Sequence, residues 1–242
     1  MEEIQTFKDL MFADVETTGT EEEDRLCQVG YRCGAKDTNE LFKPPLPIKY
    51  QAMAVHHITN EMVEDKPPFI GSGEHMIMNA MSSRVVFVAH NAKFDVDMFA
   101  KEGLEFPHVI DTLKIARHMD TAAVMESYGL QYIRYRTGIK IEAIAHDAWG
   151  DILVLEQVFM RQLRRIMENL ACSADTAVDE MLEISSKPVL IRRFNFGKHE
   201  GDLVQDVYNS DPGYLAWLEK EKLKEPDGEE DWLFTLDQLR RR

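Results

Sequence analysis

The sequence predicts an α/β fold, a mixed β-sheet flanked by helices, with a small C-terminal module. Three observations lead to this prediction. Two strand-like segments near the N-terminus form a hairpin, strand-like and helix-like segments then alternate, and the pattern breaks around residues 185–188. The expected units are a main domain (1–182), a linker (183–190), a module (191–225) and a tail that is first acidic and then basic (226–242).

The composition is that of a globular protein without a membrane span. Hydrophobic residues make up 44% and charged residues 29% of the chain, and no apolar run reaches the roughly 20 residues that cross a bilayer. The N-terminus, Met-Glu-Glu-Ile-Gln, is acidic and unlike a secretory signal, so we expect a cytoplasmic protein. Cys27, Cys33 and Cys172 have no Cys-x-x-Cys spacing and are expected to be reduced core residues.

The net charge of −15 argues against a protein that coats long duplex nucleic acid, because phosphates repel a negative surface. The charge is unevenly distributed, however. Residues 1–24 carry nine acids against one lysine, whereas residues 131–140 and 187–199 carry bases and no acid. This distribution suits an enzyme that holds a few phosphates through metal ions and short contacts.

The first expected strand contains the residues around which the rest is organised. The segment Leu10-Met-Phe-Ala-Asp-Val-Glu-Thr-Thr-Gly19 joins an apolar run to a turn signal, which is typical of a buried strand. Residues two apart on a strand point to the same side, so Asp14 and Glu16 lie side by side and Val15 faces the opposite layer. One interpretation is a solvated strand end. The other is a site for divalent cations, which would offset the repulsion between the two carboxylates.

The elements that follow are expected from apolar patterns and turn signals. Two strands form a hairpin, prolines then end the sheet on that side, and Thr59 is expected to cap a short helix that Lys66-Pro-Pro68 stops. Further on, strand-like runs rich in β-branched residues alternate with helical spacing. The expected elements are strands at 25–34, 39–43, 84–89 and 106–110, a hairpin turn at 35–38, and helices at 69–82, 93–99, 112–118, 127–137 and 151–171.

The C-terminal region has a different pattern. The run Phe194-Asn-Phe-Gly-Lys-His-Glu-Gly201 is expected to form a compact aromatic and glycine turn, followed by two short helices with Asp211-Pro-Gly between them. Residues 226–242 show poor periodicity, and we expect mobility at the end of this stretch.

Three more polar side chains are placed to join Asp14 and Glu16. Asp95 lies on the first turns of the expected helix after strand 84–89, Asp151 opens the long helix, and His146 precedes Asp151 by five residues. Carboxylates suit hard cations such as Mg²⁺ or Mn²⁺, and two such ions can support phosphodiester hydrolysis. An imidazole can take a proton from water near neutral pH, so His146 is either a general base or a plain surface histidine.

These motifs resemble those of a known enzyme family. Asp14-Val-Glu-Thr-Thr-Gly19, His90-Asn-Ala-Lys-Phe-Asp95 and His146-Asp-Ala-Trp-Gly-Asp151 match in order the three motifs of the DEDDh 3′-5′ exonucleases, which include the proofreading subunit of bacterial DNA polymerase III and ribonuclease T. The resemblance covers about residues 8–172. It implies a ribonuclease-H-like fold and two Mg²⁺ or Mn²⁺ ions. It also implies catalytic roles for five residues: Asp14, Glu16, Asp95 and Asp151 as metal ligands and His146 as general base.

The C-terminal region resembles that of the exodeoxyribonuclease X enzymes. The similar segments are Phe194–Gly201 and Asp211–Leu218, and Gln51–His56 also resembles this group. The implied activity is removal of 5′-mononucleotides from 3′ ends of DNA, single-stranded or frayed, in DNA repair or processing. The alternatives are an RNA 3′-end trimming exoribonuclease like ribonuclease T, a polymerase proofreading subunit, and a non-catalytic subunit that binds nucleic acid.

Six residues are candidates for substrate contact, each with a structural alternative. The two threonines of the first motif either hold the sugar of the terminal nucleotide or only form a turn. The second motif offers a histidine and an asparagine that either contact substrate or cap a helix, and a phenylalanine that either stacks on a base or belongs to the core. A lysine of the C-terminal region, with Arg192 and Arg193, either holds the strand or packs against the acidic body. The six candidates are Thr17, Thr18, His90, Asn91, Phe94 and Lys198.

Overall fold

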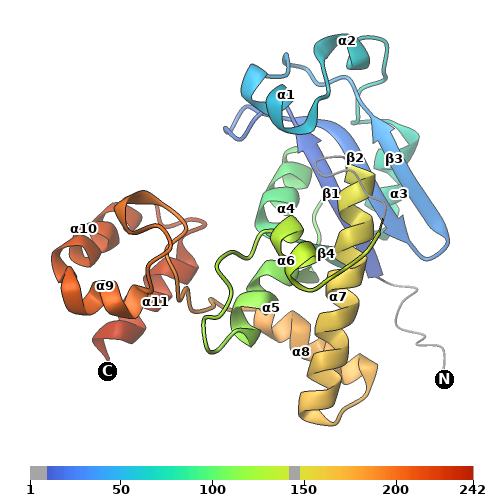
Figure 1. The fold of residues 1–242 in the computed structure, drawn as a ribbon. Coiled ribbons are helices and arrows are strands. Elements are labelled where there is room, and N and C mark those ends of the chain that lie inside the picture. The colour runs from blue at the N-terminus through green and yellow to red at the C-terminus, as the bar shows by residue number, and fades with distance from the viewer. Residues whose placement is uncertain (1–9, 142–147, 242) are drawn as a thin grey trace.

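The computed structural model describes residues 10–141 and 148–241. Its centre is a five-stranded sheet with the order β3-β2-β1-β4-β5 (Figure 1). β1 pairs antiparallel with β2 and parallel with β4, so the sheet is mixed as predicted. The strands are β1 (Leu10–Thr17), β2 (Leu26–Cys33), β3 (Lys36–Leu41), β4 (Val86–Ala89) and β5 (Val109–Asp111).

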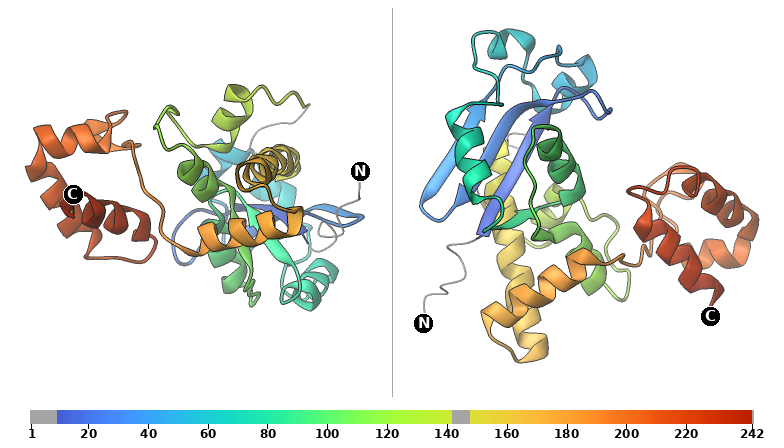
Figure 2. Two further views of the ribbon diagram at one scale, coloured as in Figure 1. Left: turned by 90° about the horizontal axis from the view of Figure 1, so that it is seen from below. Right: turned by 180° about the vertical axis from the view of Figure 1, so that it is seen from behind.

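Helices cover both faces of this sheet (Figure 2). Met11, Ala13 and Val15 of β1 belong to the core on the side of α3 and α4, whereas Leu10 and Phe12 belong to the core on the side of α5, α7 and α8. Because side chains alternate along a strand, Asp14 and Glu16 belong to the same face of β1 as Leu10 and Phe12. This is the face that α7 covers. The covering helices are α3 (Gly73–Met81), α4 (Ala92–Lys101), α5 (Thr112–Met119), α7 (Ala148–Leu170) and α8 (Ala174–Ser186).

Three short helices complete the main domain. α1 (Tyr50–His56) and α2 (Asn60–Val63) lie beyond one end of the sheet, at the top of Figure 1. α6 (Leu130–Arg136) packs against α7 through Ile133. Within the described ranges, no helix has both the length and the apolar character needed to cross a bilayer.

A glycine lies where α7 crosses β2. Gly30 pairs with Asp14 across the two strands. A Cβ atom at Gly30 would lie only 2.8 Å from Cδ1 of Ile152 and 2.9 Å from Cβ of Ala148. The missing side chain therefore lets the first turns of α7, which carry Asp151, approach the strand pair closely.

The C-terminal module has its own hydrophobic core, which includes Phe194 and Trp232 with ring centroids 4.9 Å apart. The predicted turn at residues 194–201 requires a glycine at position 197: Gly197 has a φ of 69°, and a Cβ there would lie 2.9 Å from Oη of Tyr214. Arg117 and Asp231, 3.0 Å apart, join the module to α5. The elements are the 3₁₀ turn η2 (Gly197–His199), α9 (Val204–Ser210), α10 (Pro212–Lys222) and α11 (Glu230–Arg240).

Two of the predicted strands have different bounds in the structure. The strand expected at 39–43 corresponds to β3, which begins earlier, at residue 36. The hairpin turn is therefore shorter than the predicted turn at 35–38, because Gly34, at a φ of 59°, allows a tight two-residue turn. Only Thr38 of β3 is buried, so the edge strand has little apolar pattern. The strand expected at 106–110 begins only at residue 109, because Phe106 packs in the core from the preceding loop.

The helix predictions missed three elements. No helix was predicted at α1, and Thr59 occupies the N-cap position of α2 without accepting a cap hydrogen bond. α8 runs to residue 186, into the expected linker. The tail, for which no helix was predicted, contains α11, whose Trp232, Leu236 and Leu239 are buried at helical spacing. The expected domain boundaries themselves stay a prediction.

We expect Gly30→Ala to lower the free energy of unfolding by about 1–3 kcal/mol, because the added methyl group overpacks the contact with α7. Urea unfolding followed by circular dichroism measures this change. Gly73→Ala is the matched control, since a Cβ at Gly73 meets nothing within 4 Å. Equal stability of the two variants would show that α7 does not depend on this close approach.

We expect Trp232→Ala to loosen the C-terminal module at a cost of about 3–5 kcal/mol, because Trp232 is a large buried side chain of that core. Hydrogen exchange read by mass spectrometry should show faster exchange in residues 191–240 and unchanged exchange in the sheet. Trp217→Ala is the control, since Trp217 is 51% exposed in the same module. The prediction is wrong if both variants exchange alike.

Candidate active site

Three carboxylates meet at the end of β1. Asp14, Glu16 and Asp151 each offer an oxygen atom, and these atoms all lie within 4.8 Å of one another. Asp151 is buried in the first turn of α7, and the two β1 acids are half-buried. Two full charges at such a separation repel by about 3 kcal/mol at an effective dielectric constant near 20. The predicted neighbours on β1 and α7 are thus brought together, in an arrangement that favours a bound cation.

Asp95, the fourth predicted carboxylate, lies beside this group. Asp95 is buried in the first turn of α4. Among the described residues, the three whose oxygen atoms lie within 4.8 Å of one another do not include it. Burial raises the pKa of Asp95 well above its ordinary value, backbone hydrogen bonds from its own N–H and from Val15 act in the opposite direction, and Asp111 adds to the increase. The Val15 contact places Asp95 against the backbone between Asp14 and Glu16. Its expected role as a metal ligand stays a prediction.

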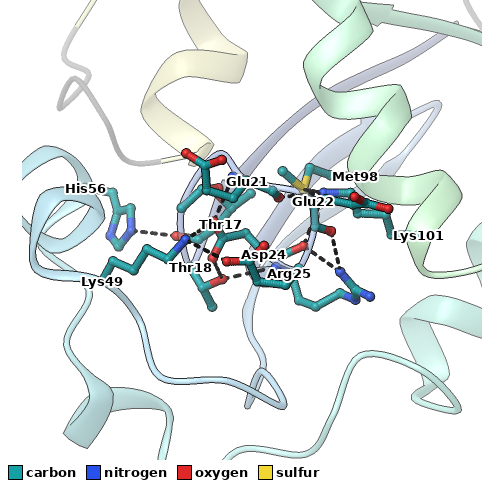
Figure 3. Close-up of polar contacts among 12 residues, drawn as sticks. Thr17, Thr18, Glu21, Glu22, Asp24, Arg25, Lys49, His56, Met98 and Lys101 are labelled. Carbon is teal, nitrogen blue, oxygen red and sulfur yellow. Dashed lines mark hydrogen bonds and ion pairs between the residues drawn. The ribbon is translucent and has the colours of Figure 1, made fainter.

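The turn after β1 is held by a buried polar network (Figure 3). The Thr18 hydroxyl donates to Asp24 over 2.7 Å, and Lys49 Nζ lies 2.6 Å from the other Asp24 oxygen. Burial acts to raise the pKa of Asp24, but hydrogen bonds from Lys49, Thr18 and the Glu21 N–H outweigh it and hold the pKa below its usual value. Although Asp24 belongs to the charged run of residues 20–24, its carboxylate is therefore held inside the protein, and the residue is only 1% exposed.

His56 supports the same turn from α1. Its Nδ1 accepts from the Ile58 N–H at 3.0 Å, so the proton lies on Nε2, which is 3.1 Å from the Thr17 carbonyl oxygen. The Thr17 hydroxyl donates to the Gly19 carbonyl at 2.7 Å. The hydroxyls of Thr17 and Thr18 both bond within the protein, which supports the interpretation of these threonines as a turn.

The residues of the second motif are engaged in the fold. His90 Nε2 lies 2.7 Å from the Tyr128 carbonyl oxygen, and its Nδ1 lies 2.8 Å from the Thr112 hydroxyl. Burial lowers the pKa of His90, which favours a neutral ring that donates from Nε2. Asn91 occupies the N-cap position of α4 at a φ of 67°, but its side chain makes no cap bond, so the capping prediction is wrong for this side chain. Phe94 is half-buried and packs against the core.

The basic candidates of the module bond within the protein. Lys198 Nζ lies 2.6 Å from Asp211, and Arg192 donates to the Arg117 carbonyl over 2.7 Å. Arg193 donates to the Ala123 carbonyl. These contacts support packing in cis for the two arginines. His146, the expected general base, lies outside the described residues, which exclude 142–147.

Sequence reasoning gave no role to Gln131, yet its side-chain nitrogen lies 2.5 Å from an oxygen of Asp151. Gln131 belongs to α6 and was predicted only as part of a helix. The sequence offers no signal for this contact, because a single glutamine in a helical segment is ordinary and the two residues meet only through the packing of α6 on α7.

The chemistry of the donors suits a hard divalent cation. Carboxylate oxygens are the ligands preferred by Mg²⁺ and Mn²⁺, and three of them converge here. The nearby thiol of Cys27 is no competing ligand, because burial, with Glu16 adding to it, raises the pKa of Cys27 to about 12 and keeps it protonated. Asp14, Glu16 and Asp151 are therefore the residues that could hold such an ion.

Comparisons with known proteins agree with this site. A family model described as exonuclease matches residues 11–159, and one described as exodeoxyribonuclease X-like C-terminal matches residues 194–222. The chain is 32% identical over 185 residues to exodeoxyribonuclease 10 of Escherichia coli (strain K12), across 74% of this chain and 75% of that protein. It is 31% identical over 163 residues to DNA polymerase III subunit epsilon of Treponema pallidum, across 60% and 72% of the two chains.

A solved structure has the same fold. The structure of exonuclease X in complex with 5′-overhanging duplex DNA matches with a TM-score of 0.56 and 23% identity, across 73% of this chain and 99% of that chain. This likeness confirms the ribonuclease-H-like sheet with helices on both faces. With the exonuclease model matched over residues 11–159 and the acids of its first and third motifs in one cluster, the chain belongs to the DEDDh exonuclease family.

Proposed function

We propose that this chain is a metal-dependent 3′-5′ exonuclease that hydrolyses phosphodiester bonds at 3′ ends of DNA and releases 5′-mononucleotides. The observation that carries the proposal is the convergence of Asp14, Glu16 and Asp151 within 4.8 Å. DNA as the substrate is supported by the similarity to exodeoxyribonuclease 10 over 74% of the chain. The proposed substrate is a single-stranded or frayed 3′ end, and the proposed location is the cytoplasm.

The residues of the proposed site have different roles. Asp14, Glu16 and Asp151 would hold two Mg²⁺ or Mn²⁺ ions, and Asp95 would act from beside them. When bound, such ions supply charge neutralisation at the reacting phosphate and orient the attacking water. His146, five residues before Asp151 in the chain, would take the proton from that water. The bonds that hold Thr17 and Thr18 keep the end of β1, and with it both of its acids, in a fixed position.

We expect Asp14→Asn and Asp151→Asn each to lower the turnover rate roughly a thousandfold, because metal ligation supplies several kcal/mol of transition-state stabilisation. The rate is measured on an end-labelled oligonucleotide, and circular dichroism checks that each variant is folded. Asp97→Asn is the control, since Asp97 is exposed on α4 and pairs with Lys93. Near-normal activity in either folded site variant would refute the assignment.

Matched DNA and RNA oligonucleotides labelled at the 5′ end test the substrate. The proposal expects a ladder that shortens by single nucleotides from the 3′ end, faster on DNA, abolished by chelation and restored by Mg²⁺ or Mn²⁺. Faster trimming of RNA would favour the ribonuclease T-like alternative. Removal of a mismatched terminal nucleotide only together with a polymerase would favour the proofreading subunit, and binding without release of nucleotides would favour a non-catalytic subunit.

A further inference from the structure

We infer that Gln131 is a positioning residue for Asp151, so that α6 as well as α7 determines how strongly the site binds a cation. The inference rests on the function proposed above, because it takes Asp151 as a metal ligand. It concerns a residue outside the three motifs. Gln131 lies in the first turn of α6, and α6 packs against α7.

The orientation of the Gln131 side chain is fixed from both ends. Its Nε2 donates to Oδ1 of Asp151 over 2.5 Å, and its Oε1 accepts from Nη1 of Arg134 over 3.1 Å. An arginine can only donate and a carboxylate can only accept, so the amide oxygen must face Arg134 and the amide nitrogen must face Asp151. Only one amide orientation satisfies both neighbours.

Arg134 is itself well anchored. It is 8% exposed, and its second terminal nitrogen donates to the carbonyl of Ile141. The side chain of Arg134 therefore holds Gln131 in place, and Gln131 in turn holds Asp151. This chain of hydrogen bonds runs from the segment after α6 to the acidic cluster.

The bond to Gln131 has a specific consequence for Asp151. The bond to Oδ1 restricts rotation of the carboxylate, so Asp151 keeps the orientation in which one of its oxygen atoms lies within 4.8 Å of oxygen atoms of Asp14 and Glu16. A carboxylate has about four lone-pair sites, and this bond uses one of them. Groups that orient a metal ligand in this way typically change metal affinity by roughly 10- to 100-fold.

The test is a titration of the purified full chain with Mn²⁺, followed by isothermal calorimetry and by electron paramagnetic resonance of free Mn²⁺. Gln131→Met keeps the length of the side chain and removes both hydrogen bonds, and we expect it to weaken Mn²⁺ binding about tenfold. Gln157→Met is the matched control, an exposed glutamine on α7 that we expect to leave Mn²⁺ binding unchanged. Gln131→Leu repeats the measurement if the methionine variant does not fold.

Two further readouts separate positioning from general stability. The melting temperature without metal should stay close to that of the unmodified chain, because Gln131 is only half-buried. At saturating Mn²⁺ the KM for a DNA oligonucleotide should change less than twofold. A lower melting temperature with unchanged Mn²⁺ affinity would overturn the inference and leave Gln131 a merely structural residue.

The same experiment distinguishes this inference from the proposed function. If the unmodified chain neither binds Mn²⁺ nor releases nucleotides, the proposed function fails. If the unmodified chain does both and Gln131→Met binds Mn²⁺ equally well, the inference about Gln131 fails and the proposed function stands.

Discussion

The mutual repulsion of three carboxylates is the constraint on which the site depends. Asp14, Glu16 and Asp151 place oxygen atoms within 4.8 Å of one another, and the fold must hold them there. Two of them are fixed by the period of a strand, because residues two apart share a face. The third comes from α7, which can approach β1 and β2 because Gly30 has no side chain. The same geometry that makes the carboxylates repel each other makes them suitable for divalent cations.

The surrounding structure keeps this cluster rigid. β1 is the central strand and has a hydrophobic core on each face, so its acids cannot shift without disturbing both cores. At its end, Thr18, Asp24 and Lys49 hold the turn by buried hydrogen bonds. The C-terminal module has a separate core and joins α5 through Asp231, whose pKa is raised by burial while the neighbouring Lys114 and Arg117 act to lower it.

Much of the fold could be predicted because its determinants are local. β1, β2 and α7 carry long apolar patterns, and Asp111 caps α5 as its position suggests. The misses have physical causes. β3 is an edge strand with one buried residue, so it has almost no apolar pattern. α11 begins in a run of acids, which makes the helical spacing of its apolar residues hard to recognise in the sequence. The contacts around the site could not be predicted from the sequence. Asp24 is charged yet buried, and Gln131 contacts Asp151 only because α6 packs on α7, so no sequence pattern indicates the burial of Asp24 or the contact of Gln131.

The most direct test of the account is a crystal structure of the chain soaked in Mn²⁺, with anomalous scattering recorded at the manganese edge. The account predicts a manganese peak bound by Asp14, Glu16 and Asp151, at oxygen distances normal for such an ion. A structure in which the three side chains are gathered as described but no manganese binds between them, or in which manganese binds elsewhere, would contradict it.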